Sequence, residues 1–386
     1  MTTSKRFDVV IAGGGPAGAV AALLLSRAGA RVAVFDRARF PRHKLCGDTV
    51  NPGTMAILRR LGVEQSAGTF AIQGMVVTGE GGVRIAGRYP DGISGRAVLR
   101  RDFDHALLNA AAGAGAQIEQ EVLVRGATGE GTVDGVEILG RARRMERVGA
   151  RMVIVADGRH SRVARLLGIA RHPRKPRRWA VGAYFGDVRG LTACGEMHIR
   201  RGKYIGVAPL PGGLTNACVV TADRRAVRDP LRLLHATLAG EPELSERFAG
   251  ARLASPPVVL GPLAVECSAA GMPGLLLAGD AAGFIDPMTG DGLRFALRGA
   301  ELAAREALHA LEHGVADAHV RLECARRREF GAKWRFNRAL RLMAGSPSGV
   351  RVAARAAALL PSSVEQAILY AGDVQISGRA GELIRT

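Results

Sequence analysis

Three glycines near the start of the chain form the first pattern that could do chemistry. Gly13, Gly15 and Gly18 follow the apolar run 7–12 in a G-x-G-x-x-G arrangement. The first glycine permits a sharp turn, the second lets the backbone approach a pyrophosphate, and the third lets a helix pack against a sheet. Asp36 ends the next apolar run, where a carboxylate can accept a hydrogen bond from a ribose 2′-hydroxyl. These residues predict a site for a dinucleotide.

The elements that must position these residues are a strand at 7–12, a helix that starts after the glycines and a strand at 31–36. The phosphates would sit at the N-terminus of the helix, where backbone N–H groups lack partners. Pro16 and Ala17 belong to the same turn. Asp36 leaves no favourable place for a 2′-phosphate, so we expect FAD or NAD(H) at this site and not NADP(H).

Cys46 is a second candidate, in a basic, glycine-containing loop that follows the second strand. Arg42, His43 and Lys44 precede it, and nearby positive charge favours the thiolate, which is the reactive form. Loops on a rigid scaffold often carry function. An inert cysteine packed in the loop fits the same residues, so both interpretations stay open.

Two later apolar runs also end in glycine and aspartate. Residues 151–156 lead into Asp157-Gly158, and residues 274–278 lead into Gly279-Asp280. Pro287 and two closely spaced glycines then precede a predicted helix at 293–313. The N-terminus of that helix could offer N–H groups to an electron-rich ring edge.

The block from about 180 to 263 alternates like a β-sheet and interrupts the α/β pattern. We therefore predict an α/β fold with α+β insertions. It would contain a Rossmann-type domain that binds FAD or NAD(H), an inserted antiparallel β-sheet domain for the substrate, and C-terminal helices. The predicted boundaries are 1–70, 98–175 and 265–313 for the dinucleotide-binding domain, 71–97 and 176–264 for the substrate domain, and 314–386 for the helical segment.

The formal net charge of +19 resembles that of a nucleic-acid-binding protein, but only five of the 54 basic residues are lysines. No aromatic-interleaved basic module or zinc finger accompanies the arginines, so we expect no nucleic-acid partner. Five cysteines without a C-x-x-C pair predict neither a disulfide framework nor a metal site. Because the first predicted strand begins at residue 7, we expect no signal peptide and a cytoplasmic protein.

Together these motifs resemble the FAD-dependent monooxygenase superfamily with the para-hydroxybenzoate hydroxylase fold. The resemblance covers residues 7 to about 310 and rests on four ordered motifs. They are G-x-G-x-x-G with the distal Asp36, Arg100-x-x-Phe103-Asp104, Ala156-Asp157-Gly158-x-x-Ser161, and Gly279-Asp280-Ala281-Ala282 with the residues up to Gly292. Within the superfamily, Lys44-x-Cys46-Gly47-Asp48 and the stretch 283–292 most resemble the geranylgeranyl reductase branch, which reduces C=C bonds of isoprenoid chains.

The resemblance implies a role for each matching residue. The glycine turn and Asp36 would hold the ADP half of FAD, Arg100 would contact the adenosine or phosphate side, and the turn at 290–292 would face the isoalloxazine ring. The implied cofactor-binding residues are Gly13, Gly15, Pro16, Ala17, Gly18, Asp36, Arg37, Cys46, Gly47, Arg100, Asp157, Gly158, Gly279, Asp280, Pro287, Gly290, Asp291, Gly292 and Leu293. The candidate catalytic residues are Cys46, Asp48 and Tyr204.

The sequence departs from the reductase branch in one place. The branch carries alternating tyrosine, tryptophan and phenylalanine before a proline in the substrate sheet, and here Tyr204, Gly206, Ala208 and Pro209 stand at those positions. Small residues there predict a wider pocket over the flavin. The two tryptophans of flavin-dependent halogenases are absent too, which argues against halogenation.

Three functions remain open at this stage. Most favoured is an FAD-dependent oxidoreductase that reduces a C=C bond of an apolar isoprenoid, quinone-like or other natural-product substrate. The alternative is an FAD-dependent monooxygenase that acts on an aromatic or polyketide substrate through a flavin C4a-hydroperoxide. A non-catalytic flavoprotein is the third. With no second G-x-G-x-x-G, NAD(P)H would bind only transiently. The C-terminal helices could pack as a subdomain, cap the substrate cavity or contact a membrane surface, and the oligomeric state is open.

Overall fold

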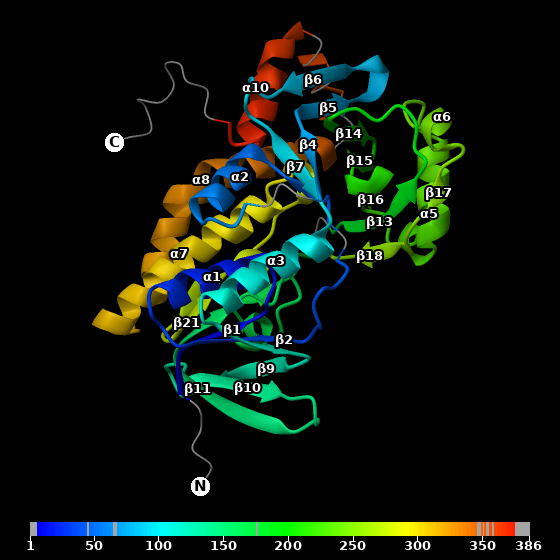
Figure 1. Ribbon diagram of the computed structural model, residues 1–386. Helices are drawn as coiled ribbons and strands as arrows, with labels where there is room; N and C mark the ends of the chain where they lie inside the picture. The colour runs from blue at the N-terminus through cyan, green and yellow to red at the C-terminus, as the bar shows by residue number, and fades with distance from the viewer. Residues whose placement is uncertain are drawn as a thin grey trace.

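The computed structural model describes residues 6–44, 46–64, 68–174, 177–345 and 359–374, together with residues 349, 351–352 and 355–356. A mostly parallel sheet forms the centre of the nucleotide-binding part, with strands in the order β20-β21-β11-β1-β2-β8 (Figure 1). The strands are β1 (Arg6–Ala12), β2 (Val32–Asp36), β8 (Gln117–Gln120), β11 (Met145–Val155), β20 (Gly271–Met272) and β21 (Leu275–Leu277); β9 (Leu123–Thr128) and β10 (Gly135–Leu139) extend it through β11.

The register of this sheet brings the predicted motifs to one edge. Ala12 pairs with Val155 on one side and with Phe35 on the other, and Val155 pairs with Leu277. All four strands are parallel, so their carboxyl ends lie together. In open α/β sheets this edge is where ligands bind.

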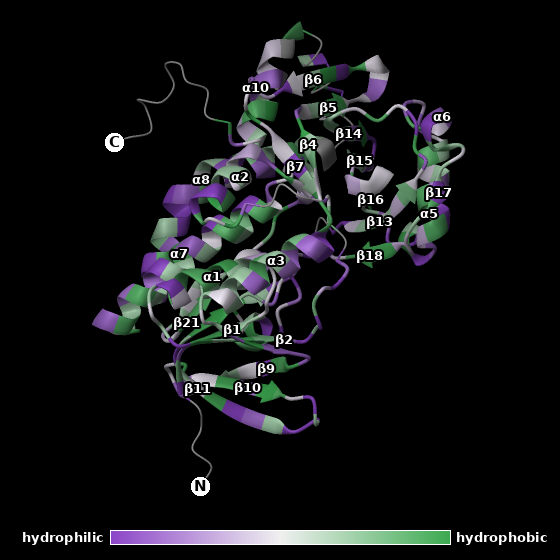
Figure 2. Cartoon of the chain, viewed as in Figure 1, coloured by the Kyte–Doolittle hydropathy of each residue, from purple (hydrophilic) through white to green (hydrophobic). Residues whose placement is uncertain are grey.

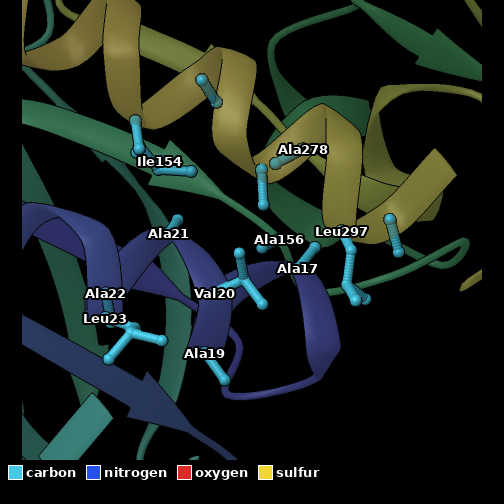
Figure 3. Close-up of a cluster of buried hydrophobic side chains, with 14 of the residues drawn as sticks. Ala17, Ala19, Val20, Ala21, Ala22, Leu23, Ile154, Ala156, Ala278 and Leu297 are labelled. Atoms are coloured by element: carbon cyan, nitrogen blue, oxygen red, sulfur yellow. The ribbon is translucent and has the colours of Figure 1, made fainter. Parts of the chain in front are cut away.

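Helices α1 (Pro16–Arg27), α3 (Arg100–Gly113) and α7 (Gly292–His313) pack on one face of the sheet. The packing is close because α1 presents small side chains such as Ala19, Ala21 and Ala22, each fully buried. Figure 3 shows the α1 side chains gathered with Ile154 and with Leu297 of α7. The helix predicted at 293–313 is thus present.

A second sheet forms the inserted part, in the order β17-β13-β16-β15-β14-β5-β6, with β18 also on β13 (Figure 1). Neighbouring strands are antiparallel except β14 and β5, which are parallel. Its strands are β5 (Gly74–Thr78), β6 (Arg84–Arg88), β13 (Trp179–Gly186), β14 (Cys194–Arg200), β15 (Lys203–Pro209), β16 (Leu214–Thr221), β17 (Arg252–Leu253) and β18 (Val258–Leu260); α5 (Pro230–Ala239) and α6 (Ser245–Phe248) pack beside it. The predicted fold class is confirmed, and the exact domain boundaries stay a prediction.

Smaller elements connect the two sheets. They are the sheet of β3 (Thr49–Val50), β7 (Gly95–Val98) and β4 (Thr69–Ile72), with α2 (Pro52–Arg60), α4 (Arg162–Leu166), β12 (Ala170–Arg171) and β19 (Glu266–Cys267). Strand β3 follows the loop that contains Cys46 and pairs with β7.

The chain ends in α8 (Ala318–Gly345) and α10 (Pro361–Ala371). Figure 2 shows long hydrophilic stretches on α8. Helix α10 lies against β6, where Ile368 packs on Ile85 (Figure 1). The predicted helical segment 314–386 is described only to residue 374, with gaps at 346–348, 350, 353–354 and 357–358. Within the described part, no helix is both long and apolar enough to cross a bilayer; the cytoplasmic location stays a prediction.

Candidate active site

A cavity of about 1320 Å³ runs from the glycine turn, past the Cys46 loop, to the second sheet and the C-terminal helices. The predicted cofactor-binding residues that line it are Gly13, Gly15, Pro16, Ala17, Asp36, Arg37, Cys46, Gly47, Arg100, Asp157, Gly158, Gly279, Asp280, Pro287, Gly290, Gly292 and Leu293. Gly18, Asp48, Tyr204 and Asp291 are predicted site residues outside the cavity lining formed by the described residues. The fold therefore brings most of the predicted set to one space, from segments far apart in the sequence.

The glycine turn fits a dinucleotide by its shape. Gly13 has φ of +100°, and a Cβ there would lie 2.5 Å from the Ala156 carbonyl oxygen. A Cβ at Gly18 would lie 1.8 Å from the Gly13 carbonyl oxygen, so Gly18 serves the packing of α1 on the turn. At Gly15, by contrast, the nearest described atom would be an Arg42 nitrogen 3.6 Å away. The backbone is open there, as a pyrophosphate requires.

Asp36 holds the turn together as well as facing the cavity. Its carboxylate accepts hydrogen bonds from the Gly14 N–H at 2.7 Å and from the Ala38 N–H at 2.8 Å. Carboxylate oxygens have further lone pairs, so the predicted bond to a ribose hydroxyl is compatible with these contacts and stays a prediction.

Two arginines add positive charge to the nucleotide end. Arg159 donates to Asp280 at 3.3 Å, while its Nη1 atom makes no hydrogen bond to any described residue. Arg42 pairs with Asp104 at 3.1 Å, and both arginines line the cavity. A buried guanidinium nitrogen without a partner suits a phosphate oxygen. Arg159 follows Asp157-Gly158 directly in the sequence, which is the signal that could have identified it.

The turn before α7 is the predicted contact for the flavin ring. Gly290 adopts a left-handed φ of +69°, and α7 begins at Gly292. The first N–H groups of a helix lack intrahelical partners, so this turn can offer backbone donors. The Asp291 carboxylate is buried and lies 3.2 Å from Lys333 Nζ, so it serves the fold; burial raises its pKa.

The Cys46 loop is joined to the second sheet by Asn216. The Asn216 amide nitrogen donates to the Cys46 carbonyl oxygen at 2.6 Å and to Asp48 Oδ2 at 2.7 Å. Arg100 is buried, bonds Asp104 at 2.7 and 2.9 Å, and interacts with Cys46. The contact between Arg100 and the adenosine or phosphate side of FAD stays a prediction. In the structure the Arg100 guanidinium interacts with the Cys46 side chain.

The environment of this loop changes the acidity of its groups. Asp48 is fully buried, and burial raises its pKa to about 7. Burial also lowers the pKa of Lys44 to about 8, helped by the charge of Arg100. Shifts of this size are common where proton transfer takes place.

Tyr184 and Asn216 also belong to this cluster, and the sequence did not identify them as site residues. They are cross-strand partners on β13 and β16. Because their proximity depends on strand register, nothing local in the sequence indicates it.

Tyr204 lies in the second sheet away from this cluster. Its hydroxyl donates to Asp286 Oδ1 at 2.6 Å, and Asp286 also pairs with Arg178 at 3.0 Å. Tyr204 thus holds the loop before α7, and its predicted catalytic role stays untested. Gly206 and Ala208, on the same face of β15, do line the cavity, and a Cβ at Gly206 would meet no described atom within 4 Å. This open space agrees with the wider pocket expected from the sequence.

A family model described as an FAD-binding domain matches residues 6–229. The chain belongs to this FAD-binding family. Relatives of the flavoprotein include menaquinone reductase of Mycolicibacterium smegmatis, 33% identical over 321 residues that cover 78% of this chain and 76% of the relative. Digeranylgeranylglycerophospholipid reductase 1 of Methanopyrus kandleri is 30% identical over 328 residues, which cover 80% of this chain and 82% of the relative.

Solved structures agree on the fold. A geranylgeranyl bacteriochlorophyll reductase-like protein from Thermoplasma acidophilum has a TM-score of 0.80 at 21% identity, over 98% of this chain and 95% of that one. A flavin-dependent brominase has a TM-score of 0.85 at 19% identity, over 99% of this chain and 98% of the brominase chain. At these identities the likeness concerns the fold alone, and the resemblance to the reductase branch is confirmed by the relatives. The flavoprotein is an FAD-dependent oxidoreductase.

The residues present fit FAD at both ends of the cavity. The open backbone at Gly15 and the unpaired Arg159 nitrogen suit the pyrophosphate, and the turn at Gly290 suits the ring. When bound, FAD supplies reversible two-electron chemistry, and the protein supplies position and electrostatics. A reductant such as NAD(P)H stays a prediction.

Proposed function

We propose that this flavoprotein reduces a C=C bond of an apolar isoprenoid or quinone-like substrate. The main support is that one cavity runs from the flavin turn across the second sheet to the C-terminal helices. The reductase relatives, whose names specify a quinone and an isoprenoid lipid, support the same chemistry.

The part of the cavity beyond the cofactor residues is mostly apolar. The side chains that line it from the second sheet include Met75, Val77, Ile85, Met197 and Ile199, and those from the C-terminal helices include Phe336, Leu340, Met343 and Ile368. A hydrocarbon chain gains free energy by leaving water, at about 0.8 kcal/mol per buried CH₂. Such a lining favours a long apolar substrate over a small polar one.

Single-turnover assays would test the reaction. The FAD-loaded protein is reduced with dithionite without oxygen and mixed with menaquinone or a geranylgeranyl lipid, and the product is analysed by mass spectrometry. We expect reoxidation of the flavin and a gain of two hydrogen atoms in the isoprenoid chain, located by fragmentation after any quinol has been reoxidised in air. A parallel reaction with oxygen provides the contrast, because a product that gains an oxygen atom there, with no hydrogenation in the first assay, would overturn the reductase proposal.

We also propose that the C-terminal helices touch an anionic membrane surface, from which such a substrate would enter. Leu342, Val352 and Leu359 are 71%, 65% and 79% exposed, and the exposed Arg351 and Arg355 lie among them in the sequence. Leu360 and Met343 are exposed and also line the cavity. Apolar side chains with neighbouring arginines are typical of interfacial helices.

Vesicle sedimentation would test this contact. The protein should sediment with vesicles that contain phosphatidylglycerol more than with phosphatidylcholine alone, and Leu359→Asp should weaken binding. Leu166→Asp is the matched control, because Leu166 is 64% exposed but lies on α4. Equal sedimentation of Leu359→Asp and wild type would contradict the proposed surface.

A further inference from the structure

Tyr184 occupies a special position in the wall of the cavity. It lies on β13 opposite Asn216 of β16, and both residues line the cavity. The neighbouring row across the sheet is Gly182 and Cys218, and the next strand contributes Gly206 to it. Tyr184 therefore presents a hydroxyl where most of the surrounding lining is small or apolar.

Asp48 lies directly behind this tyrosine. The Tyr184 hydroxyl interacts with the Asp48 carboxyl group. Asp48 Oδ2 is fixed by the Asn216 amide at 2.7 Å, whereas Oδ1 accepts no hydrogen bond from any residue that the structure describes. A fully buried carboxylate is costly, and protonation lowers that cost because it removes the charge.

We propose that Tyr184 donates the proton that completes C=C reduction and that Asp48 passes its own proton to Tyr184. This inference rests on the proposed reductase function. FAD, when bound and reduced, would supply the hydride, with its electron pair, for one alkene carbon. The neighbouring carbon takes H⁺ from the Tyr184 hydroxyl, and the tyrosine oxygen takes H⁺ from the Asp48 carboxyl. After the product leaves, water in the cavity returns the proton to Asp48 through Tyr184, which lines the cavity. Two C–H bonds replace the π bond, and the flavin is oxidised.

The charges around the pair agree with a neutral, proton-loaded state. The titratable and charged groups that face Asp48 are Tyr184, Arg100, Asp104 and Cys218. Arg100 bonds Asp104 through Nε and Nη2, and Asp104 also pairs with Arg42. Arg100 therefore keeps part of its charge and lowers the pKa of Asp48, against the larger effect of burial, which raises it. Burial, together with the neighbouring Asp48, raises the pKa of Tyr184 well above its ordinary value. Burial thus favours the protonated form of both groups, as a donor relay requires.

Two substitutions test the relay without removing bulk. Tyr184→Phe keeps the ring, and Asp48→Asn keeps the shape of the carboxyl group. Asparagine also tolerates the left-handed backbone that Asp48 adopts, with φ of 53°. Tyr370→Phe is the matched control, because Tyr370 is 40% exposed on α10 and its hydroxyl serves no part of this cluster.

The kinetic test follows a single turnover of the FAD-loaded, reduced protein with a geranylgeranyl lipid, which has no quinone ring to take up hydrogen. Tyr184→Phe should slow alkene reduction by about 10²–10⁴-fold and should remove the pH dependence of the rate near pH 7, with FAD content unchanged. The wild-type rate should fall as pH rises through about 7, and the Asp48→Asn rate should be low at every pH. Tyr370→Phe should match wild type in all of these measurements.

A spectroscopic test is independent of turnover. The infrared difference between wild type and Asp48→Asn should contain a protonated carboxyl band that titrates near pH 7, with or without FAD. Absence of this band from pH 5 to 8, or a Tyr184→Phe rate equal to wild type, would overturn the relay alone. A wild-type protein that reduces no alkene would instead overturn the proposed function, and the relay with it.

Discussion

The Lys333 ammonium lies 3.2 Å from the Asp291 carboxylate, and both side chains are buried. Lys333 comes from α8, whereas Asp291 precedes α7 at the predicted flavin turn. Lys333 also donates to the carbonyl oxygen of Ala371 at the end of α10. One buried cation thus joins the C-terminal helices to the turn on which the flavin ring is expected to rest.

Removal of that cation should destabilise the fold. Lys333→Met leaves Asp291 buried without its partner, which typically costs about 3–5 kcal/mol. Urea denaturation should therefore give a lower midpoint, while Lys203→Met, on a less buried lysine, should change the midpoint little. The double variant Asp291→Asn, Lys333→Met should recover part of the loss. A midpoint for Lys333→Met equal to wild type would contradict the importance of the pair.

Gly13→Ala should abolish FAD binding. The new Cβ would lie 2.5 Å from a backbone oxygen that cannot move easily, at a φ of +100° that alanine avoids. The absorbance of the purified protein in the flavin bands, at roughly 350–500 nm, measures the bound cofactor. Gly126→Ala is the control, since no described atom would come within 4 Å of its Cβ. A yellow Gly13→Ala protein would refute the prediction.

Cys46→Ser should keep FAD but lose turnover. The thiol lines the cavity, and the loop itself is held by the Asn216 bond to the Cys46 backbone, which serine retains. Flavin content and single-turnover rate measured on the same sample separate the two effects. Cys324→Ser, on an exposed thiol, should resemble wild type. Full activity in Cys46→Ser would return the cysteine to a packing role.

Gly206→Phe should narrow the substrate pocket. A Cβ at this position points into open space, so the ring can be accommodated without a backbone clash. We expect unchanged FAD content and a KM for a bulky quinone that rises by about tenfold, equivalent to about 1.4 kcal/mol. Gly206→Ala should lie between this variant and wild type. If all three proteins had the same KM, the cavity at β15 would not hold the substrate.

Asp48 should make the folded state less stable as pH rises. Its native pKa of about 7 exceeds the unfolded value of about 3.9, so between these values the native state retains a proton that the unfolded state has released. Its contribution is therefore complete below about pH 4 and is lost as pH passes through about 7, at about 1.4 kcal/mol per unit. Denaturation at pH 5 and pH 7 should show a smaller decline for Asp48→Asn than for wild type. Equal declines would mean that Asp48 titrates in its ordinary range.

The sequence by itself determined the nucleotide-binding half of this protein. The glycine turn, Asp36 and the Gly-Asp motifs after two buried strands are local patterns, because each reflects a backbone that must bend sharply or approach a phosphate. Parallel strands then bring their carboxyl ends to one edge, so the convergence of Gly13, Asp157 and Gly279 followed from the pattern.

Only the tertiary structure decided which groups surround the substrate. Tyr184, Asn216 and Asp48 meet because of strand register and a loop that crosses between sheets, and Lys333 reaches Asp291 from a distant helix. No local pattern encodes such contacts, since register and helix docking are set by side-chain packing across the whole chain. The same packing excludes water from Asp48 and thereby raises its pKa. Its acidity is thus a property of the fold that residue type alone does not specify.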